Sequence, residues 1–400
     1  MPEPGAAPPL SPRAGRVSAS PTAAFSDLAE RLRRRGRDVI SLAAGEPDFD
    51  TPASIVKAAH EALDQGRTRY APVRGLPEMR RAVRRKLVRD NGLACEDENI
   101  MVTAGAKQAV ALAVEVLAGP GDEVVVPTPY WVSYPEMVRL AGARPVAAAT
   151  GDGFKLDADG LSRVLSPRTR ALILNSPCNP TGAVYSAEEL RAIADVCIAA
   201  GIAVISDEIY EKIVFDGRHD SIAAVDPRMR DHTVVVNGCS KAYAMTGWRI
   251  GYASGPPRVI AAMAALASQR TTSACTFSQA AAAFALENEP PEVGRMCAAY
   301  RRRRDLMAAA LADMDIACPL PPATFYLLAD IRDRLPARLG DTDIPDAHHF
   351  ARVLLEQTGV AVVPGEPFGA PGHLRLSFAT SRARIRRATE RLAAFLRRLR

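Results

Sequence analysis

Lys241 is the residue of this sequence whose setting most clearly suggests chemistry. It lies among small and apolar side chains in NGCSKAYAMTGWRIGYASGP, residues 237–256. Lysine is rare in this chain, because only six of its 51 basic residues are lysines and the rest are arginines. Burial lowers the pKa of a lysine, and the resulting neutral amine can attack a carbonyl and form a Schiff base. Arginine cannot do so, because its guanidinium stays protonated.

Further polar residues stand where predicted strands end. They are Asn179 in NSPCNPTG, Asp207 and Tyr210 in SDEIY, and Ser240 directly before Lys241. In an open parallel sheet, ligands bind beyond the carboxyl ends of the strands, so we expect these side chains to converge on one crevice. Each alone has a simpler interpretation, since Asn and Asp cap helices and a Pro-Thr-Gly segment builds a turn. Their joint occurrence favours a site.

The sequence contains a candidate for each part of a pyridoxal phosphate site. This aldehyde cofactor needs a lysine that binds it and a carboxylate at its pyridine nitrogen, for which Lys241 and Asp207 are the candidates. The candidates for a phosphate cradle are Ser240, Arg249 and the glycine-containing turn TAGAKQA, since helix starts and arginines bind phosphate. Trp131 is the candidate for an aromatic cover on the ring. Pyridoxal 5′-phosphate is therefore the predicted cofactor.

The elements that must position these residues alternate between strands and helices. Short β-branched runs closed by Pro, Gly, Asp or Asn predict buried strands at 122–129, 170–177, 201–208 and 232–238. Between the second and third runs, one helix face is predicted from the spacing of Leu190, Ile193, Ala194, Cys197 and Ile198. This alternation predicts an α/β fold, a three-layer sandwich with a mostly parallel sheet covered by helices on both sides.

Beyond residue 290 the pattern changes to that of a smaller α+β domain. An Arg-rich helix is followed by predicted strands at 325–331, 360–365 and 373–379 and by a final basic amphipathic helix. Two domains also suit a chain of 400 residues. We interpret residues 1–18, rich in Pro, Ala and Gly, as a disordered tail. The expected domains are residues 51–290 for the large cofactor-binding domain, and residues 19–50 with 291–400 for the small one.

Composition argues against several classes of protein. The net charge is +6, but the arginine runs are typical of solvated helix faces and lack aromatic interleaving, so we expect no nucleic acid partner. No apolar run approaches the length of a membrane span or forms a signal peptide. The seven cysteines are widely spaced without a C-x-x-C pair. This spacing predicts reduced thiols in a cytoplasmic protein and no metal site.

Eight motifs, in family order, resemble those of the fold-type-I pyridoxal-phosphate aminotransferases, and within class I those of the bacterial aspartate aminotransferase branch. They are SLAAGEPDFDTP, RYAPVRGLPEMR, TAGAKQA, PTPYWVSYPEMVRLAG, NSPCNPTG, SDEIY, NGCSKAYAMTGWRIGYASGP and LRLSFATS. The resemblance runs from about residue 20 to the C-terminus. It implies an enzyme that moves the amino group of aspartate or glutamate to a 2-oxo acid through pyridoxal phosphate by a ping-pong mechanism.

The resemblance also implies a role for each matching residue. Lys241 would bind the cofactor and move the proton between the substrate Cα and the cofactor C4′. Asp207 would pair with the pyridine nitrogen, and Tyr210 with Asn179 would hydrogen-bond the phenolic oxygen. The phosphate group would be held by Gly105, Ala106, Ser240, Arg249 and, from a neighbouring subunit, Tyr70. The substrate α-carboxylate would be bound by Arg375, Gly45 and Asn179, with Trp131 against the ring. A site shared in this way implies a homodimer.

Fewer residues bear on the choice of substrate. Lys107 matches a position that binds the distal carboxylate of aspartate or glutamate in this branch, although a solvated lysine in a first helical turn is the simpler interpretation. Thr22 matches a position near the same carboxylate. Two stretches depart from the family pattern, namely Ala323 with Thr324 in place of a Gly-Ala pair, and Arg270 in place of a small hydroxyl residue. These departures concern the identity of the substrate and leave the cofactor chemistry unaffected.

Several alternatives stay open at this point. The same scaffold serves enzymes that use prephenate, an aromatic oxo acid or a specialised metabolite, and others that act as lyases or decarboxylases. A non-enzymatic transcription regulator built on an aminotransferase-like domain would need a DNA-binding domain before the core, for which the residues ahead of the first motif are too few. A dehydrogenase is disfavoured, because no G-x-G-x-x-G segment opens a helix after a strand.

Overall fold

The structure is a computed structural model of the chain. It describes residue 15 and residues 21–400, without the side chains of residues 21–23 and 26. Apart from residue 15, the tail predicted at residues 1–18 lies outside the described residues, and so does the side chain of Thr22.

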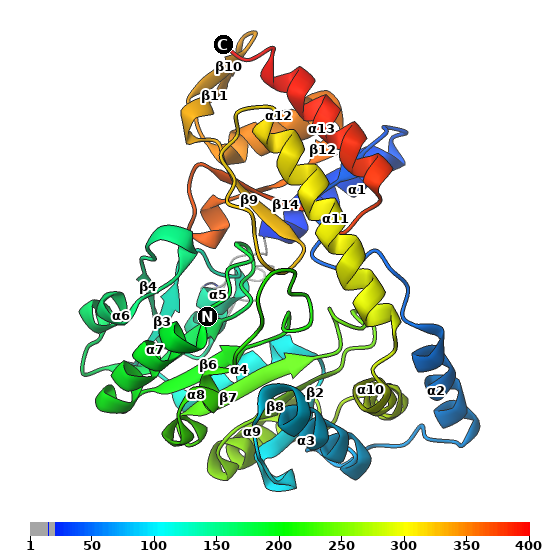
Figure 1. The fold of residues 1–400 in the computed structure, drawn as a ribbon, viewed down its shortest axis with the longest axis vertical. Helices are drawn as coiled ribbons and strands as arrows, with labels where there is room; N and C mark the ends of the chain where they lie inside the picture. Colours follow the sequence, from blue (N-terminus) through cyan, green and yellow to red (C-terminus); the bar gives the residue numbers. More distant parts are fainter. Residues whose placement is uncertain (1–14, 16–20) are drawn as a thin grey trace, which may run out of the picture.

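A seven-stranded sheet forms the centre of the larger part of the molecule (Figure 1). Its strand order is β2-β8-β7-β6-β5-β3-β4, and β8 runs antiparallel to both neighbours whereas the other pairs are parallel. The strands are β2 (Ile100–Thr103), β3 (Glu123–Pro127), β4 (Arg144–Ala148), β5 (Thr169–Asn175), β6 (Ala203–Asp207), β7 (Thr233–Gly238) and β8 (Gly251–Ser254). The predicted mostly parallel sheet is confirmed.

Helices cover both faces of this sheet, because successive side chains of a strand point to opposite sides. Val234 and Val236 of β7 pack with α4, α5 and α9, whereas Val235 packs with α2, α3 and α10 on the other face. On that second face, Val204 of β6 packs with α6, α7 and α8. The helices are α2 (Ala53–Asp64), α3 (Pro77–Asn91), α4 (Ala106–Leu117), α5 (Ser133–Leu140), α6 (Ala158–Val164), α7 (Ala187–Ala200), α8 (Ile222–Val225), α9 (Pro257–Arg270) and α10 (Thr276–Asn288). The predicted three-layer arrangement is thereby confirmed.

The helix predicted between the second and third strands is α7, and its ends follow from its sequence. The Ser186 hydroxyl accepts a hydrogen bond from the Glu189 amide at 3.2 Å, and the Glu189 carboxylate accepts one from the Ser186 amide at 2.7 Å. This reciprocal pair is a capping box, which satisfies two amides that a helix start leaves free. Gly201 ends the helix with a φ of 64°, a conformation that glycine adopts without strain. The chain then enters β6, which delivers Asp207.

The remaining elements form a second core. Strands β13, β14 and β9 make an antiparallel sheet that packs on α11, α12 and α13. These and the other elements of this part are α11 (Glu292–Ala312), β9 (Tyr326–Asp330), β10 (Ala337–Leu339), β11 (Thr342–Ile344), α12 (Ala347–Thr358), β12 (Val360–Ala361), β13 (Val363–Pro364), β14 (His373–Ser377) and α13 (Arg382–Leu396). The long helix α11, yellow in Figure 1, runs from the part that holds the large sheet to this second part.

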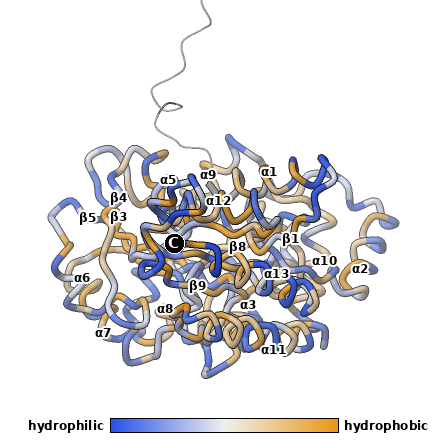
Figure 2. The backbone as a smooth tube through the Cα atoms, turned by 90° about the horizontal axis from the view of Figure 1, so that it is seen from above, coloured by the Kyte–Doolittle hydropathy of each residue, from blue (hydrophilic) through white to orange (hydrophobic). Residues whose placement is uncertain are grey.

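The N-terminal segment packs with this second core. Strand β1 (Ile40–Ser41) pairs in parallel with β12, and Phe25 of α1 (Pro21–Arg34) is buried in the same hydrophobic cluster. We propose that the chain divides into its two domains near residues 50 and 290. Seen from above, hydrophobic segments run through the middle of the molecule (Figure 2). Among the described residues, no helix combines the length and the apolar character that crossing a membrane requires.

Candidate active site

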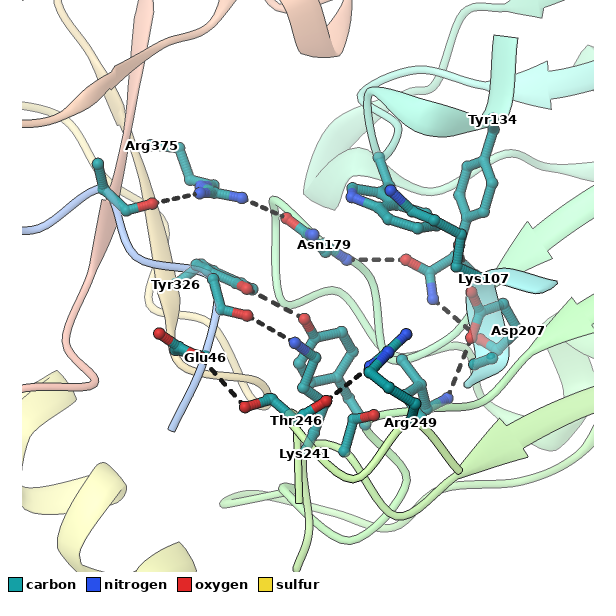
Figure 3. Close-up of a pocket in the computed structure, with 18 residues that line it drawn as sticks. Glu46, Lys107, Tyr134, Asn179, Asp207, Lys241, Thr246, Arg249, Tyr326 and Arg375 are labelled. Carbon is teal, nitrogen blue, oxygen red and sulfur yellow. Dashed lines mark hydrogen bonds between the residues drawn. The ribbon is translucent and has the colours of Figure 1, made fainter. Parts of the chain in front are cut away.

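A cavity of about 410 Å³ lies where the carboxyl ends of β5, β6 and β7 meet the second core (Figure 3). This volume falls within the usual range for small-molecule sites. Most of the predicted site residues line it, namely Gly45, Ala106, Lys107, Trp131, Asn179, Asp207, Tyr210, Ser240, Lys241, Arg249 and Arg375. The fold therefore brings together side chains from both cores of the molecule.

Lys241 follows β7 and points into the cavity. Its Nζ donates a hydrogen bond to the Gly45 carbonyl at 2.5 Å. Burial lowers the pKa of Lys241 to about 8, and the carboxylate of Glu46 opposes this shift. The cationic side chains of Arg375 and Arg249 lower the pKa further. Near neutral pH, part of the amine is therefore unprotonated and able to act as a nucleophile or base.

Asp207 ends β6 and is only 3% exposed. The Tyr134 hydroxyl donates to its Oδ2 at 2.7 Å, and the Ile209 amide donates to its Oδ1 at 3.2 Å. Burial raises the pKa of Asp207 to about 6, although the hydrogen bond from Tyr134 acts in the opposite direction. A buried carboxylate that is held in this way is suited to accept an N–H group of a ligand.

Arg375 lies on β14 and is only 2% exposed. Its Nη2 donates to the Ala43 carbonyl at 2.9 Å and its Nη1 donates to Asn179 Oδ1 at 3.2 Å. The guanidinium lies 4.4 Å from the centroid of the Tyr326 ring, and within the described residues its Nε has no hydrogen-bond partner. Burial lowers the pKa of Arg375. A buried guanidinium with a free donor is suited to bind a carboxylate.

The ends of β5 and β6 are tied to each other beside the cavity. Asn175 Oδ1 accepts from the Asn179 amide at 2.9 Å, and Asn175 Nδ2 donates to the Asp207 carbonyl at 2.9 Å. Tyr210 is 3% exposed, and its hydroxyl lies 3.0 Å from the hydroxyl of Tyr326. The sheet itself thus fixes the positions of the predicted cofactor-binding residues on this side.

The start of α4 and the turn after β7 form a cradle suited to an anion. Gly105 precedes α4 with a φ of 87°, and a Cβ there would lie 2.4 Å from Arg249 Nη2. A Cβ at Gly251 would lie 2.4 Å from the Ala106 amide nitrogen. Arg249 Nη1 donates to the Thr246 carbonyl at 2.6 Å. Because the first amides of a helix lack partners within it, a helix start beside an arginine suits a phosphate group.

Lys107 and Trp131 form another wall of the cavity. Lys107 Nζ lies 4.9 Å from the centroid of the Trp131 ring, within the range of a cation–π interaction. Burial lowers the pKa of Lys107, and the nearby charge of Arg249 adds to this shift. Trp131 in turn packs edge-on against Tyr134, with 5.3 Å between the ring centroids. A cation therefore faces the cavity from the first turn of α4.

Among the described residues, two predicted site residues do not line the cavity, and a third, Thr22, cannot be placed there. Tyr70 is 90% exposed, so its expected contact with the phosphate group requires a second subunit. Gly105 contributes only the backbone that lies against Arg249. The side chain of Thr22 lies outside the described residues, so its expected contact stays a prediction.

The two stretches that depart from the family pattern also lie outside the cavity lining. Arg270, at the end of α9, forms an ion pair with Glu115 of α4. Ala323 and Thr324 are fully buried, and the Thr324 amide donates to the Ile213 carbonyl at 2.8 Å. Within this chain, neither stretch reaches the cavity where a substrate would bind.

Several residues of the cavity were not predicted from the sequence. The polar ones are Glu46, Tyr134, Asn175, Thr246 and Tyr326. Tyr134 follows Trp131 in the motif PTPYWVSYPEMVRLAG, but α5 begins at Ser133, so no helical spacing in the sequence indicates that the two rings pack together. Glu46 and Asn175 belong to motifs quoted above, but the motifs themselves indicate no role for these two residues. Nothing in the sequence around Thr246 indicates its contact with Glu46.

Comparison with known proteins decides the family. Residues 37–392 match the family described as aminotransferase class I and II. The chain belongs to this family. The aminotransferase is 47% identical over 392 residues to the aspartate/prephenate aminotransferase of Thermus thermophilus, a match that covers 97% of this chain and 98% of the relative. The resemblance predicted from the eight motifs is thus confirmed.

Solved structures agree with this assignment. The aspartate aminotransferase of Thermus thermophilus with maleate has a TM-score of 0.92 to this aminotransferase at 46% identity, covering 97% of this chain and all of the other. The aspartate aminotransferase of Rhizobium meliloti has a TM-score of 0.95 at 40% identity, covering 98% of this chain and all of the other. The predicted fold class is therefore confirmed as well, whereas the roles of individual residues stay predictions.

Proposed function

We propose that this aminotransferase binds pyridoxal 5′-phosphate and transfers the amino group of aspartate or glutamate to a 2-oxo acid in a ping-pong cycle. The observation that carries the proposal is the position of Arg375. Its buried guanidinium, with a free Nε among the described residues, faces the same cavity as the amine of Lys241. An amino acid whose α-carboxylate binds Arg375 would bring its α-carbon into reach of that amine.

The cavity offers a suitable group for each part of the cofactor. Asp207 provides a buried carboxylate for the pyridine nitrogen, and Lys241 provides an amine for the aldehyde. Ser240, Arg249 and the start of α4 provide donors for the phosphate group. When bound, pyridoxal phosphate serves as an electron sink that stabilises negative charge at the substrate α-carbon.

The protein's own residues would then bind the substrate and move the proton. Arg375 and Asn179 would orient the α-carboxylate, because they are already joined by a hydrogen bond. Lys241 Nζ would take the proton from the substrate α-carbon and deliver it to the cofactor C4′, which a pKa of about 8 permits near neutral pH. Tyr210, held by Tyr326, would hydrogen-bond the phenolic oxygen of the cofactor together with Asn179.

The cofactor and its lysine can be tested directly. Purified protein should show the absorbance of pyridoxal phosphate bound as a Schiff base, and borohydride reduction should fix the cofactor onto Lys241 in a peptide identified by mass spectrometry. The Lys241→Ala variant should lack this absorbance. Lys57→Ala removes an exposed lysine that pairs with Glu61 on α2, and this control should absorb as the wild type does. A Schiff-base absorbance that survives in Lys241→Ala would refute the assignment.

Two observations support an acidic substrate. Lys107 presents a cation to the cavity, and the similar Thermus thermophilus structure is one with maleate, a dicarboxylate. Lys107→Met keeps much of the side-chain length but removes the charge. It should raise the KM for aspartate roughly 10- to 150-fold, since a charge-assisted hydrogen bond contributes about 1.5–3 kcal/mol, and should leave the KM for an aromatic amino acid nearly unchanged. Equal losses on both donors would deny Lys107 a selective role.

A second candidate acceptor is prephenate. The Thermus thermophilus relative that is 47% identical carries prephenate in its name. A panel of amino donors against oxaloacetate, 2-oxoglutarate, prephenate and an aromatic oxo acid would rank the acceptors. Release of ammonia or carbon dioxide without any acceptor would instead favour a lyase or a decarboxylase.

We further propose that the enzyme works as a homodimer in the cytoplasm. The high exposure of Tyr70, which the family resemblance places at a neighbouring subunit's phosphate, supports a shared site. All seven cysteines are free, which suits a reducing compartment. Sedimentation velocity at micromolar concentration would test the dimer.

A further inference from the structure

Glu46 is a charged residue of the cavity that the proposed function leaves without a role. Its Oε2 accepts a hydrogen bond from Thr246 Oγ1 at 3.1 Å, and both residues line the cavity with Lys241 (Figure 3). The carbonyl of the preceding residue, Gly45, accepts the hydrogen bond from Lys241 Nζ. The Thr246 contact fixes the Glu46 carboxylate in the cavity that also holds the amine, and from there its charge opposes the fall in the pKa of Lys241.

The other charges around Lys241 are mainly positive. The cations that line the cavity are Lys107, Arg249 and Arg375, and the acids are Glu46 and Asp207. The phenols that line it are Tyr134, Tyr210 and Tyr326. The Asp207 carboxylate is engaged by two donors of its own, the Tyr134 hydroxyl and the Ile209 amide. Glu46 is the other acid of the cavity, and it directly follows Gly45, whose carbonyl binds the Lys241 amine.

We propose that Glu46 is a positioning residue that supplies the counter-charge for the Lys241 amine during proton transfer. When Nζ takes up a proton, the amine becomes an ammonium and the cavity gains a positive charge beside Arg249 and Arg375. The Glu46 carboxylate offsets this gain, so that Nζ can hold the proton until it is passed on. The inference rests on the proposed function, in which Lys241 carries the proton.

Thr246 connects this counter-charge to the phosphate end of the cavity. Its hydroxyl donates to Glu46, while its carbonyl accepts from Arg249 Nη1 at 2.6 Å. The same residue therefore fixes a carboxylate of the cavity and a guanidinium next to the start of α4. Because Glu46 lies on an exposed stretch of chain, a change of its side chain leaves the two hydrophobic cores intact.

The test is a pH titration of the absorbance of the cofactor-loaded protein at constant ionic strength. Glu46→Gln retains the size of the side chain and an oxygen for Thr246, but it removes the charge. The midpoint of the pH-dependent absorbance change should fall by about half a unit to one unit, because an opposite charge nearby favours the protonated nitrogen of Lys241. Glu46→Asp keeps the charge and should shift the midpoint by less than half as much.

Asp48→Asn is the matched control. It removes a carboxylate two residues away, whose Oδ1 lies 2.6 Å from Arg303 Nη1 outside the cavity lining, and it should leave the midpoint unchanged. A wild-type protein without cofactor absorbance would refute the proposed function itself. If the absorbance is present, an unmoved midpoint in Glu46→Gln, or equal shifts in the Gln and Asp variants, would overturn the role of Glu46.

Discussion

The ionised carboxylate of Asp207 destabilises the folded chain as long as no ligand binds it. Burial raises its pKa from 3.8 to about 6, so the ionised carboxylate is less stable in the folded protein than in the unfolded chain. Between these two pKa values the folded state binds more protons than the unfolded state, and its stability falls as the pH rises. A bound cofactor that donates an N–H group would relieve this strain.

Replacing Asp207 should therefore stabilise the protein when no cofactor is bound. Asp207→Asn should raise the free energy of unfolding by about 3 kcal/mol above pH 6, since one pKa unit corresponds to about 1.4 kcal/mol, and by almost nothing below pH 4. Tyr134 can still bond to the amide. Urea denaturation at pH 4 and pH 7.5 measures the difference, with the exposed Asp195→Asn as control. A gain that does not depend on pH would show that the carboxylate charge is not its cause.

Arg375 supports a second prediction at this scale. Arg375→Lys keeps a positive charge but loses the planar fork that holds the Ala43 carbonyl, Asn179 and a substrate carboxylate together. The value of kcat/KM for aspartate should fall about 100-fold, which corresponds to about 2.7 kcal/mol. Cofactor absorbance should be preserved, because Arg375 is expected to bind the substrate. Steady-state kinetics and absorbance spectra distinguish the two effects, and a loss of both together would place Arg375 at the cofactor instead.

The segment after β6 contributes residues both to the cavity and to a buried ionic cluster that holds the segment in place. Asp207 and Tyr210 line the cavity, whereas Glu208 and Glu211 belong to a buried ionic cluster. Glu211 pairs with Lys86 of α3. Glu208 accepts hydrogen bonds from Ser206 at 2.9 Å and from Ser221 at 2.6 Å, and it lies 3.0 Å from His219 Nε2. This cluster anchors the segment that presents the two cavity residues.

Breaking the pair between Lys86 and Glu211 should destabilise the fold strongly. Lys86 is fully buried, so Lys86→Met would remove the lysine partner of the buried Glu211 carboxylate and lower the free energy of unfolding by about 3–5 kcal/mol. Against the effect of burial, the charges of Lys86 and His219 lower the pKa of Glu211 below 4.5. This contribution is therefore present above pH 4.5 and is lost as the pH falls through the lowered pKa. Urea denaturation should show that Lys86→Met loses much of the free energy of unfolding at pH 7 and little of it at pH 4, relative to the wild type. A deficit of equal size at both would point to packing rather than charge.

The strands that were predicted from the sequence and the strands that were not differ in how they are packed. The central strands β3, β5, β6 and β7 carry the β-branched runs that buried strands need, and all four were predicted. Strand β4 (RPVAA) is a partly exposed edge strand, and β8 (GYAS) begins with Gly251, whose missing side chain leaves room for Ala106. Neither has a distinctive pattern of its own. The same holds in the site, where Lys241 and Asp207 lie in readable motifs but the contact of Tyr134 with Asp207 exists only in the folded chain.

At the scale of the whole molecule, the question is whether one chain contains a complete site. The cavity has a cradle for a phosphate group at the start of α4, but Tyr70, the residue expected to complete it, is 90% exposed. Tyr70 contributes little to the stability of its own subunit at this exposure, because an aromatic side chain stabilises a fold through the surface that it buries. A symmetric dimer would place each Tyr70 at the other subunit's site, since the same patch serves both partners of a two-fold interface.

Subunit complementation would decide between a shared and a self-contained site. Tyr70→Ala and Lys241→Ala proteins, each with its own affinity tag, are expected to be weakly active or inactive alone. In a mixed dimer, one site would combine Lys241 of the first variant with Tyr70 of the second and would be intact. Random pairing makes half of the dimers mixed with one intact site each, so co-expression should restore about one quarter of the wild-type activity. The doubly tagged fraction should hold nearly all of it. Activity that stays at the level of the separate variants would show that Tyr70 does not act across the interface.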